Sequence, residues 1–135
     1  MTFKHNLPVL VSLAVLCGAA SAESTLELCY QKANSEAEIN ACLKQELTVV
    51  RNEYRALVES SQKEAGERDR VTGGKNIIAS SLEKSNVAFD RFVTEQCNLD
   101  KAIAGSGDAG VAANLSCQVN LLYWRMGILE NSLSK

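Results

Sequence analysis

Apolar residues recur at alternating steps of four and three in the first half of the chain. They are Leu43, Leu47, Val50, Tyr54 and Leu57. This spacing places all of them on one face of an α-helix. Just before the stripe, Ser35 and Glu38 have the spacing of a capping box, so we expect the helix to begin there. After Val58 the chain is polar on nearly every side, so the helix either continues in solvent or frays before TGG at 72–74 ends it.

Two further stretches keep the same rhythm and predict two more long helices. The first contains Ile78, Leu82, Ser85, Phe89, Phe92, Gln96, Leu99 and Ile103, with Val93 and Cys97 widening its face. The second contains Val111, Leu115, Leu122, Met126, Leu129 and Leu133, with Leu121, Trp124 and Ile128 as a second apolar flank. We expect this last helix to be the most enclosed, and residues 25–33 to form a short extra helix. No segment alternates convincingly with period two. The prediction is therefore an all-α antiparallel bundle of three long helices plus a short N-terminal one.

The first 22 residues have the organisation of a secretory signal peptide. A short polar start with Lys4 is followed by the apolar run LPVLVSLAVLCGAA and by ASA at 20–22, a small-x-small cleavage signal. We predict cleavage between Ala22 and Glu23. The mature protein is then a single domain, residues 23–135, which is long enough to bury about two thirds of its unfolded surface.

Two alternatives exist for this N-terminal segment. An uncleaved anchor is disfavoured because the apolar run is too short for a good membrane span and a cleavage signal follows closely. A lipoprotein attached at Cys17 is disfavoured because a small residue normally precedes a lipid-acceptor cysteine, and here the residue is Leu16. We therefore expect a periplasmic protein that has no membrane attachment after cleavage.

The charge composition excludes one large class of partners. The chain has 14 basic and 16 acidic residues, for a net charge of −2. It lacks the basic patch of a nucleic-acid-binding protein, so we expect no nucleic-acid partner. A mildly acidic exported protein suits a cationic partner, but so small a bias does not identify one, and the oligomeric state is left open.

The segment GSGDAG at 105–110 matches G-x-G-x-x-G, the fingerprint of a dinucleotide-binding loop. That fingerprint requires a buried strand before it, within a parallel sheet, whereas the spacing of the preceding segment is helical. We therefore expect no nucleotide ligand. The prediction is instead a hairpin tip, in which Gly105 ends one helix and Asp108 caps the next.

The predicted tip also decides how the cysteines pair. Once the signal is removed, an even number of cysteines remains, and an exported chain with four cysteines is expected to form two disulfides. Folding at the glycine loop brings Cys97 and Cys117 to the same height, about two helical turns from the tip. Cys29 and Cys42 flank the helix break at Asn34 about equally. The predicted disulfides are therefore Cys29–Cys42 and Cys97–Cys117, rather than free thiols or a metal site.

The sequence shows no catalytic constellation. Its one histidine, His5, lies in the signal segment, so no Ser–His or Cys–His pair is expected in the mature chain. The carboxylates are scattered over helix faces, and no pair has surroundings that would shift its pKa. Tyr123 and Trp124 fit packing at the core better than a ligand platform. We expect no enzyme activity, no cofactor and no metal.

The cysteine frame resembles the LprI-like family of small exported bacterial proteins, some of which have been linked to lysozyme inhibition. The matching features are Cys29, Cys42, Leu47, Tyr54, Phe89, Cys97, the 105–110 loop, Cys117, Arg125 and Leu129. They cover nearly the whole mature chain. The chain departs from the family pattern at Phe89, where tryptophan is frequent, at Val93, where arginine is found, and at Leu122, which replaces a threonine.

The resemblance implies a non-catalytic periplasmic inhibitor of lysozyme or a related peptidoglycan hydrolase. Lysozymes are usually cationic and have a cleft lined by carboxylates, which a disulfide-braced tip could enter. The candidate partner-contact residues are therefore Ser106, Gly107 and Asp108. The alternative is an envelope interaction protein without a hydrolase target, such as an assembly partner or a toxin-immunity protein. The charged segment KEAGERDR, for which no core is expected, favours this alternative.

Overall fold

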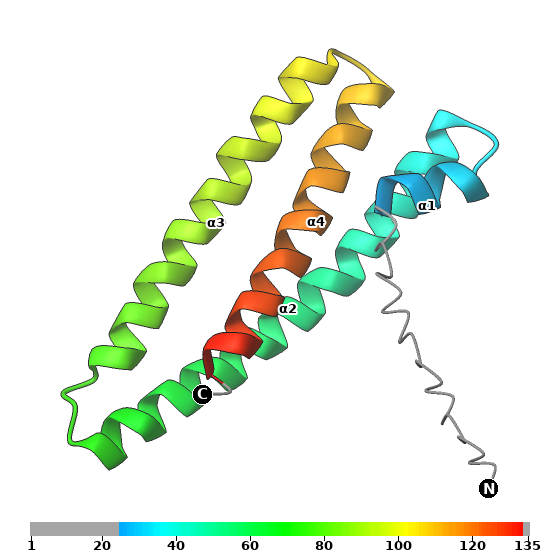
Figure 1. The fold of residues 1–135 in the computed structure, drawn as a ribbon. Helices are drawn as coiled ribbons and strands as arrows, with labels where there is room; N and C mark the ends of the chain where they lie inside the picture. The colour runs from blue at the N-terminus through cyan, green and yellow to red at the C-terminus, as the bar shows by residue number, and fades with distance from the viewer. Residues whose placement is uncertain (1–24, 134–135) are drawn as a thin grey trace, which may run out of the picture.

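The computed structural model describes residues 25–133 as four α-helices joined by short turns (Figure 1). They are α1 (Thr25–Lys32), α2 (Glu36–Thr72), α3 (Ile77–Ala104) and α4 (Asp108–Leu133). The predicted all-α fold is confirmed, including the short N-terminal helix. The predicted signal segment 1–22, its cleavage site and Cys17 lie outside the described residues. None of the four helices in the described range is long and apolar enough to cross a membrane.

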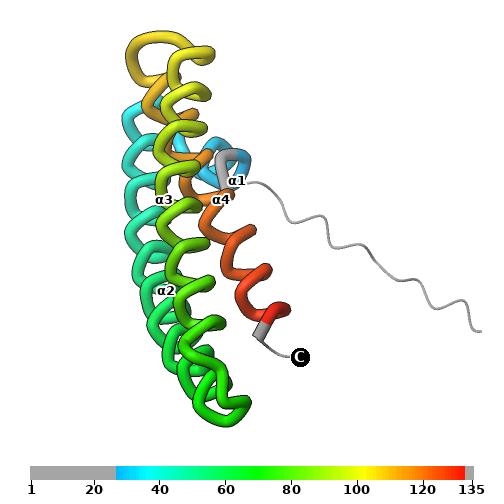
Figure 2. The backbone as a smooth tube through the Cα atoms, turned by 90° about the vertical axis from the view of Figure 1, so that its left-hand side faces the viewer, coloured from blue at the N-terminus to red at the C-terminus, as the bar shows by residue number. Residues whose placement is uncertain are grey.

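The three long helices form a bundle in which α3 runs antiparallel to both α2 and α4 (Figure 1). α4 packs against both of the other long helices and is the most enclosed of the three, as predicted. α1 folds back beside the first turns of α2 and also touches α4. Figure 2 shows that the hairpin of α2 and α3 extends beyond the C-terminal end of α4.

The start of α2 follows the predicted capping box closely. The hydroxyl oxygen of Ser35 accepts a hydrogen bond from the backbone N–H of Glu38 at 3.3 Å. The Glu38 carboxylate accepts in return from the backbone N–H of Asn34 at 2.7 Å. The return bond thus reaches the residue before the cap rather than the cap itself. Both bonds fix the turn that separates α1 from α2.

The core is built from the predicted stripe of α2 and the residues of α3 and α4 that face it. Its buried members are Leu47, Val50, Tyr54, Phe89, Val93, Cys97, Cys117, Val119, Leu122 and Leu129. A second, smaller cluster joins α1, α2 and α4. It consists of Cys29, Ile39, Leu43 and Ala112. The apolar stripe predicted for the first long helix is therefore confirmed.

Part of the apolar stripe predicted for α3 lies outside the core. The exposed members are Ile78, Phe92, Leu99 and Ile103. On α4, Trp124 was expected to pack, yet 57% of its surface is exposed, and Tyr123 is exposed as well. The prediction was wrong for these side chains because helical spacing shows how wide an apolar face is. It does not show how many other helices pack against that face. Among residues 25–133, only α2 and α4 lie beside α3, so it cannot bury a stripe this wide.

The polar second half of α2 is not simply solvated, and the expectation that it has no core to pack on was wrong. Ser61, Ala65 and Asp69 are buried at intervals of four residues. This spacing places them on one face of the helix. Beside them, the side-chain amide of Gln62 donates to the backbone carbonyl oxygen of Ala79 on α3 at 3.0 Å. Small side chains allow the two helices to approach closely here.

Asp69 also closes the turn between α2 and α3. α2 ends at Gly73, whose φ of 70° lies in the left-handed region, so the predicted break is confirmed. The Asp69 carboxylate, with 1% of the residue exposed, accepts from the backbone N–H groups of Ile78 at 3.0 Å and Ala79 at 2.9 Å. Asn76, which precedes α3, makes no side-chain capping bond. A residue of α2 therefore caps the N-terminus of α3.

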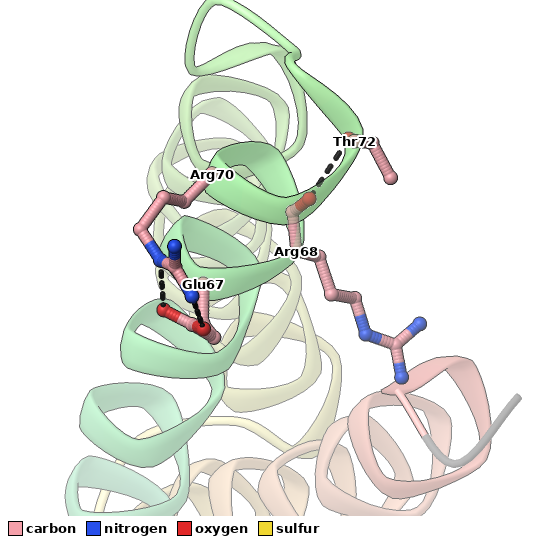
Figure 3. A network of polar contacts seen from close by, with 4 residues as sticks. All are labelled: Glu67, Arg68, Arg70 and Thr72. Carbon is pink, nitrogen blue, oxygen red and sulfur yellow. Dashed lines mark hydrogen bonds and ion pairs between the residues drawn. The ribbon is translucent and has the colours of Figure 1, made fainter.

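Exposed polar contacts lie on the outside of this end of the bundle (Figure 3). The guanidinium of Arg70 donates to the Glu67 carboxylate, and the Thr72 hydroxyl donates to the backbone carbonyl oxygen of Arg68 at 2.8 Å. Arg68 extends toward the C-terminal end of α4. Exposed ion pairs at this spacing contribute little stability. The buried Asp69, rather than these pairs, holds the turn.

Candidate functional site

The glycine loop forms the tip between α3 and α4, as predicted. α3 ends at Ala104, and the N–H of Gly105 donates to the carbonyl oxygen of Lys101 at 3.1 Å. Gly105 and Gly107 have φ values of 94° and 91°, a region that is unfavourable for residues with a side chain. Gly110 serves a different purpose, because a Cβ atom there would overlap the carbonyl oxygen of Gly105. The glycines thus serve the chain reversal itself.

Asp108 does not occupy the capping position that was predicted for it. It is the first residue of α4, and the carbonyl oxygen of Gly107 accepts the N–H of Val111 at 3.1 Å. The Asp108 carboxylate instead accepts from the side-chain amide of the buried Asn40 on α2 at 3.2 Å. Of the three candidate contact residues, Ser106 and Gly107 stand at the exposed tip, whereas Asp108 is held by α2.

The surroundings of the glycine motif are those of a turn between helices. A dinucleotide fingerprint lies between a strand and a helix, and all four elements described between residues 25 and 133 are helices. In the same range, no three histidine, cysteine, aspartate or glutamate side chains are grouped as a metal site would require.

Both predicted disulfides are confirmed. Cys97 and Cys117 link α3 to α4 below the tip, with their Cα atoms 5.4 Å apart. Next to this bond, the side-chain amide of Asn114 donates to the carbonyl oxygen of Cys97 at 2.8 Å. Cys29 and Cys42 link α1 to α2, with a Cα separation of 5.8 Å. The pairing fits an oxidising compartment.

A groove between α2 and α3 forms an open hollow in the described surface. Its main part has a volume of about 510 Å³ and is lined by Tyr54, Arg55, Glu59, Lys63, Asn86 and Asp90, among others. An adjoining part of about 320 Å³ shares three of these residues and reaches Leu122 of α4. We call the two parts together the α2–α3 groove. Cavities of this size hold small ligands.

Two buried polar side chains lie beneath this groove around the ring of Phe89. The guanidinium of Arg125 on α4 stacks over that ring, with its carbon 5.4 Å from the ring centroid. It donates to Ser85 Oγ and to Asn86 Oδ1, both at 2.8 Å. The ring of Tyr54 also packs against Phe89, at a centroid distance of 5.9 Å. Phe89 therefore contacts both a phenol and a guanidinium, and the guanidinium is close enough to act on the Tyr54 hydroxyl.

Both groups have unused hydrogen-bonding capacity. Within residues 25–133, the Tyr54 hydroxyl and Arg125 Nε have no hydrogen-bond partner, although only 8% of Tyr54 and 9% of Arg125 is exposed. Both acceptors of Arg125 are neutral, so no carboxylate of the described helices is hydrogen-bonded to its buried charge. Burial raises the pKa of Tyr54 and nearby Asp90 raises it further, whereas the charge of Arg125 lowers it. Buried groups of this kind are rare in folded proteins.

Exposed aromatic side chains lie on α4, away from this groove. Trp124 lies 6.3 Å from Phe89, measured between ring centroids. Beside it on α4, the Tyr123 hydroxyl donates to Glu46 of α2 at 2.7 Å. This bond, together with burial, raises the pKa of Tyr123 to about 12. Tyr123 therefore joins two helices, whereas the indole of Trp124 faces solvent.

Helical spacing did not indicate the polar residues beneath the groove, although Arg125 is among the residues that match the LprI-like frame. Asn86 precedes Phe89 by three residues, and Arg125 follows Leu122 by three, so both lie on the core faces of their helices. A polar residue at an apolar position was the available signal, because such a residue must find partners when it is buried. Their partners, however, lie on another helix and about forty residues away, which spacing alone does not reveal.

The chain was compared with protein-family models, curated protein sequences and solved structures. None of the three comparisons gives a match.

Proposed function

We propose that this protein is an exported, non-catalytic inhibitor of a lysozyme-type peptidoglycan hydrolase and acts in the periplasm. The observation that carries the proposal is the exposed Ser106–Gly107 tip, at the end of two helices that the Cys97–Cys117 disulfide cross-links. A braced loop loses little conformational entropy on binding, so most of its contact free energy contributes to affinity. The LprI-like cysteine frame favours the same function.

The tip offers hydrogen-bond donors to a cleft lined by carboxylates. The backbone N–H groups of Ser106 and Gly107 make no hydrogen bond among the described residues. Glycosidases carry a pair of carboxyl groups at the scissile bond, and carboxylates accept backbone N–H donors well. Asp108, held by Asn40, contributes by fixing the tip and not as a direct partner contact. This assignment replaces the role that the sequence suggested for Asp108.

A turbidity assay of cell-wall lysis tests the proposal. Purified protein added to a lysozyme should slow lysis in a dose-dependent way. Ser106→Trp should abolish the effect, because an indole at the tip blocks entry into a narrow cleft. Lys75→Trp is the matched control, because Lys75 is exposed in the turn at the opposite end of the bundle. Lysis that is unaffected at every molar ratio, or equal effects of the two variants, would contradict the proposal.

A second candidate is an interaction protein of the envelope, and a different surface favours it. Phe92, Leu99, Ile103 and Trp124 are exposed on α3 and α4, and large exposed apolar surfaces mark protein contacts. The packing of the second half of α2 removes the support that this alternative drew from an unsupported charged helix. Capture of an envelope protein by the wild type and not by Trp124→Ser, without any hydrolase inhibition, would select this candidate.

A further inference from the structure

The α2–α3 groove presents opposite charges that do not neutralise each other. Arg55 on α2 and Asp90 on α3 line both parts of the groove. Neither forms an ion pair within residues 25–133, where the two ion pairs found are Arg68–Glu64 and Arg70–Glu67. A cation and an anion that border the same hollow without pairing leave both charges available to one ligand.

The base of the groove adds a fixed polar group. Tyr54 borders both parts, is nine-tenths buried, and has a hydroxyl without a partner in the described chain. Its ring packs against Phe89, and the guanidinium of Arg125 lies close enough to act on the Tyr54 hydroxyl. A negatively charged ligand group next to Tyr54 would accept a hydrogen bond from its hydroxyl. It would also be attracted by the positive charge of Arg125.

We propose that the α2–α3 groove binds a short zwitterionic peptide. The ligand carboxylate accepts hydrogen bonds from the Tyr54 hydroxyl and the Arg55 guanidinium, and its ammonium group donates to the Asp90 carboxylate. A simple anion would be repelled by Asp90 and Glu59, and a simple cation by Arg55 and Lys63. Only a ligand that carries both charges complements both walls.

The size of the groove agrees with this ligand. An extended dipeptide is about 7 Å long and fits within the main part of about 510 Å³. Peptide side chains would rest against Val58 and the aliphatic stems of Arg55 and Lys63, which line the same hollow. None of the residues that line the groove belongs to the tip, so the inference is independent of hydrolase inhibition.

Titration of the protein with three forms of one ligand tests the charges separately. The probes are alanyl-alanine, its N-acetylated form, which lacks the ammonium, and its C-terminal amide, which lacks the carboxylate. NMR chemical shifts should saturate with alanyl-alanine and report residues of the groove. Each blocked form should bind about tenfold more weakly, since each loses one charge-assisted contact. Equal binding of all three, or no saturable shift with alanyl-alanine, would overturn the proposal.

Single substitutions should reproduce the effect of each blocked ligand. Asp90→Asn should weaken alanyl-alanine about tenfold and should not weaken the N-acetylated form, which has no ammonium to contact Asp90 and is repelled by its charge. Arg55→Gln should likewise weaken alanyl-alanine about tenfold and should not weaken the C-terminal amide, which has no carboxylate to contact Arg55. Glu95→Gln is a matched charge control on the exposed surface of α3 and should change neither affinity. If Asp90→Asn weakened all three ligands equally, the assigned contacts would be wrong.

Tyr54→Phe separates a ligand-binding hydroxyl from a structural one. It should leave the melting temperature unchanged or raise it, because it removes a buried hydroxyl that has no partner. It should weaken alanyl-alanine binding about fivefold to tenfold. Tyr30→Phe, at an exposed tyrosine of α1, is the control and should change neither quantity. A lower melting temperature with unchanged affinity would show that the hydroxyl serves the fold, and would overturn its role in the site.

Discussion

The two turns that join the long helices reverse the chain by different means. At the α3–α4 tip, Gly105 and Gly107 adopt positive φ, and the Cys97–Cys117 bond holds the helices together. At the α2–α3 turn, the carboxylate of Asp69 accepts two backbone N–H groups at the start of α3. The disulfide acts mainly by restricting the unfolded chain, whereas the carboxylate acts in the native state. One bundle thus uses covalent closure at one end and a buried cap at the other.

Removing the disulfide at the tip should have the largest effect. Replacement of both Cys97 and Cys117 by alanine should lower the free energy of unfolding by about 3 kcal/mol, since the bond closes a short loop. Urea unfolding measures the loss. Hydrogen exchange should show faster opening near the tip and unchanged protection of the Ile78 and Ala79 amides at the other end. A loss below about 1 kcal/mol would mean that the glycine turn holds the hairpin by itself.

Asp69→Ala should come next, at about 2 kcal/mol of lost stability, because two backbone donors lose a charged acceptor. Glu67→Ala is the matched control, since Glu67 lies on the same turn of α2 but points to solvent with Arg70 (Figure 3). It should change the urea midpoint little. Equal effects of the two substitutions would show that the α2–α3 turn does not depend on its buried carboxylate.

Local signals made much of the fold predictable. The capping box at Ser35 and Glu38 fixed the start of α2, and the glycines at 105–110 placed a tip. The disulfide pairs followed from the symmetry of the cysteines about the turns. The capping box and the glycine loop involve residues that are close in sequence. The cysteines of each pair lie about equally far from a turn, so their spacing was sufficient to predict the pairing.

The features that spacing could not reveal depend on a second helix. Asp69 looks like any carboxylate of a solvated helix until α3 places two N–H groups beside it. Phe92 and Trp124 look like core residues until the bundle proves to have no helix to cover them. The candidate site could not be predicted for the same reason. Tyr54 of α2 and Arg125 of α4 come together through their contacts with Phe89 of α3.

Gly107→Ala should cost less than either preceding change, about 1 kcal/mol, because its φ of 91° disfavours a side chain although the space around it is open. Thermal unfolding followed by circular dichroism measures the loss and should show unchanged helix content. Ser106→Ala, at the neighbouring position, is the control and should be nearly neutral. A neutral Gly107→Ala would indicate that the tip changes its backbone conformation readily, which would weaken the case for a preorganised contact loop.

Gly66→Ala should have the smallest effect and the opposite sign. Gly66 lies within the second half of α2, and a Cβ atom there would meet no atom within 4 Å. Alanine loses less backbone entropy than glycine when a helix forms, so stability should rise by about 0.5–1 kcal/mol. Gly127→Ala on α4, where the space is also open, should give a similar gain. If only Gly127→Ala were stabilising, the second half of α2 would not be a fully formed helix in solution, and the cap that Asp69 provides would be too weak to hold it.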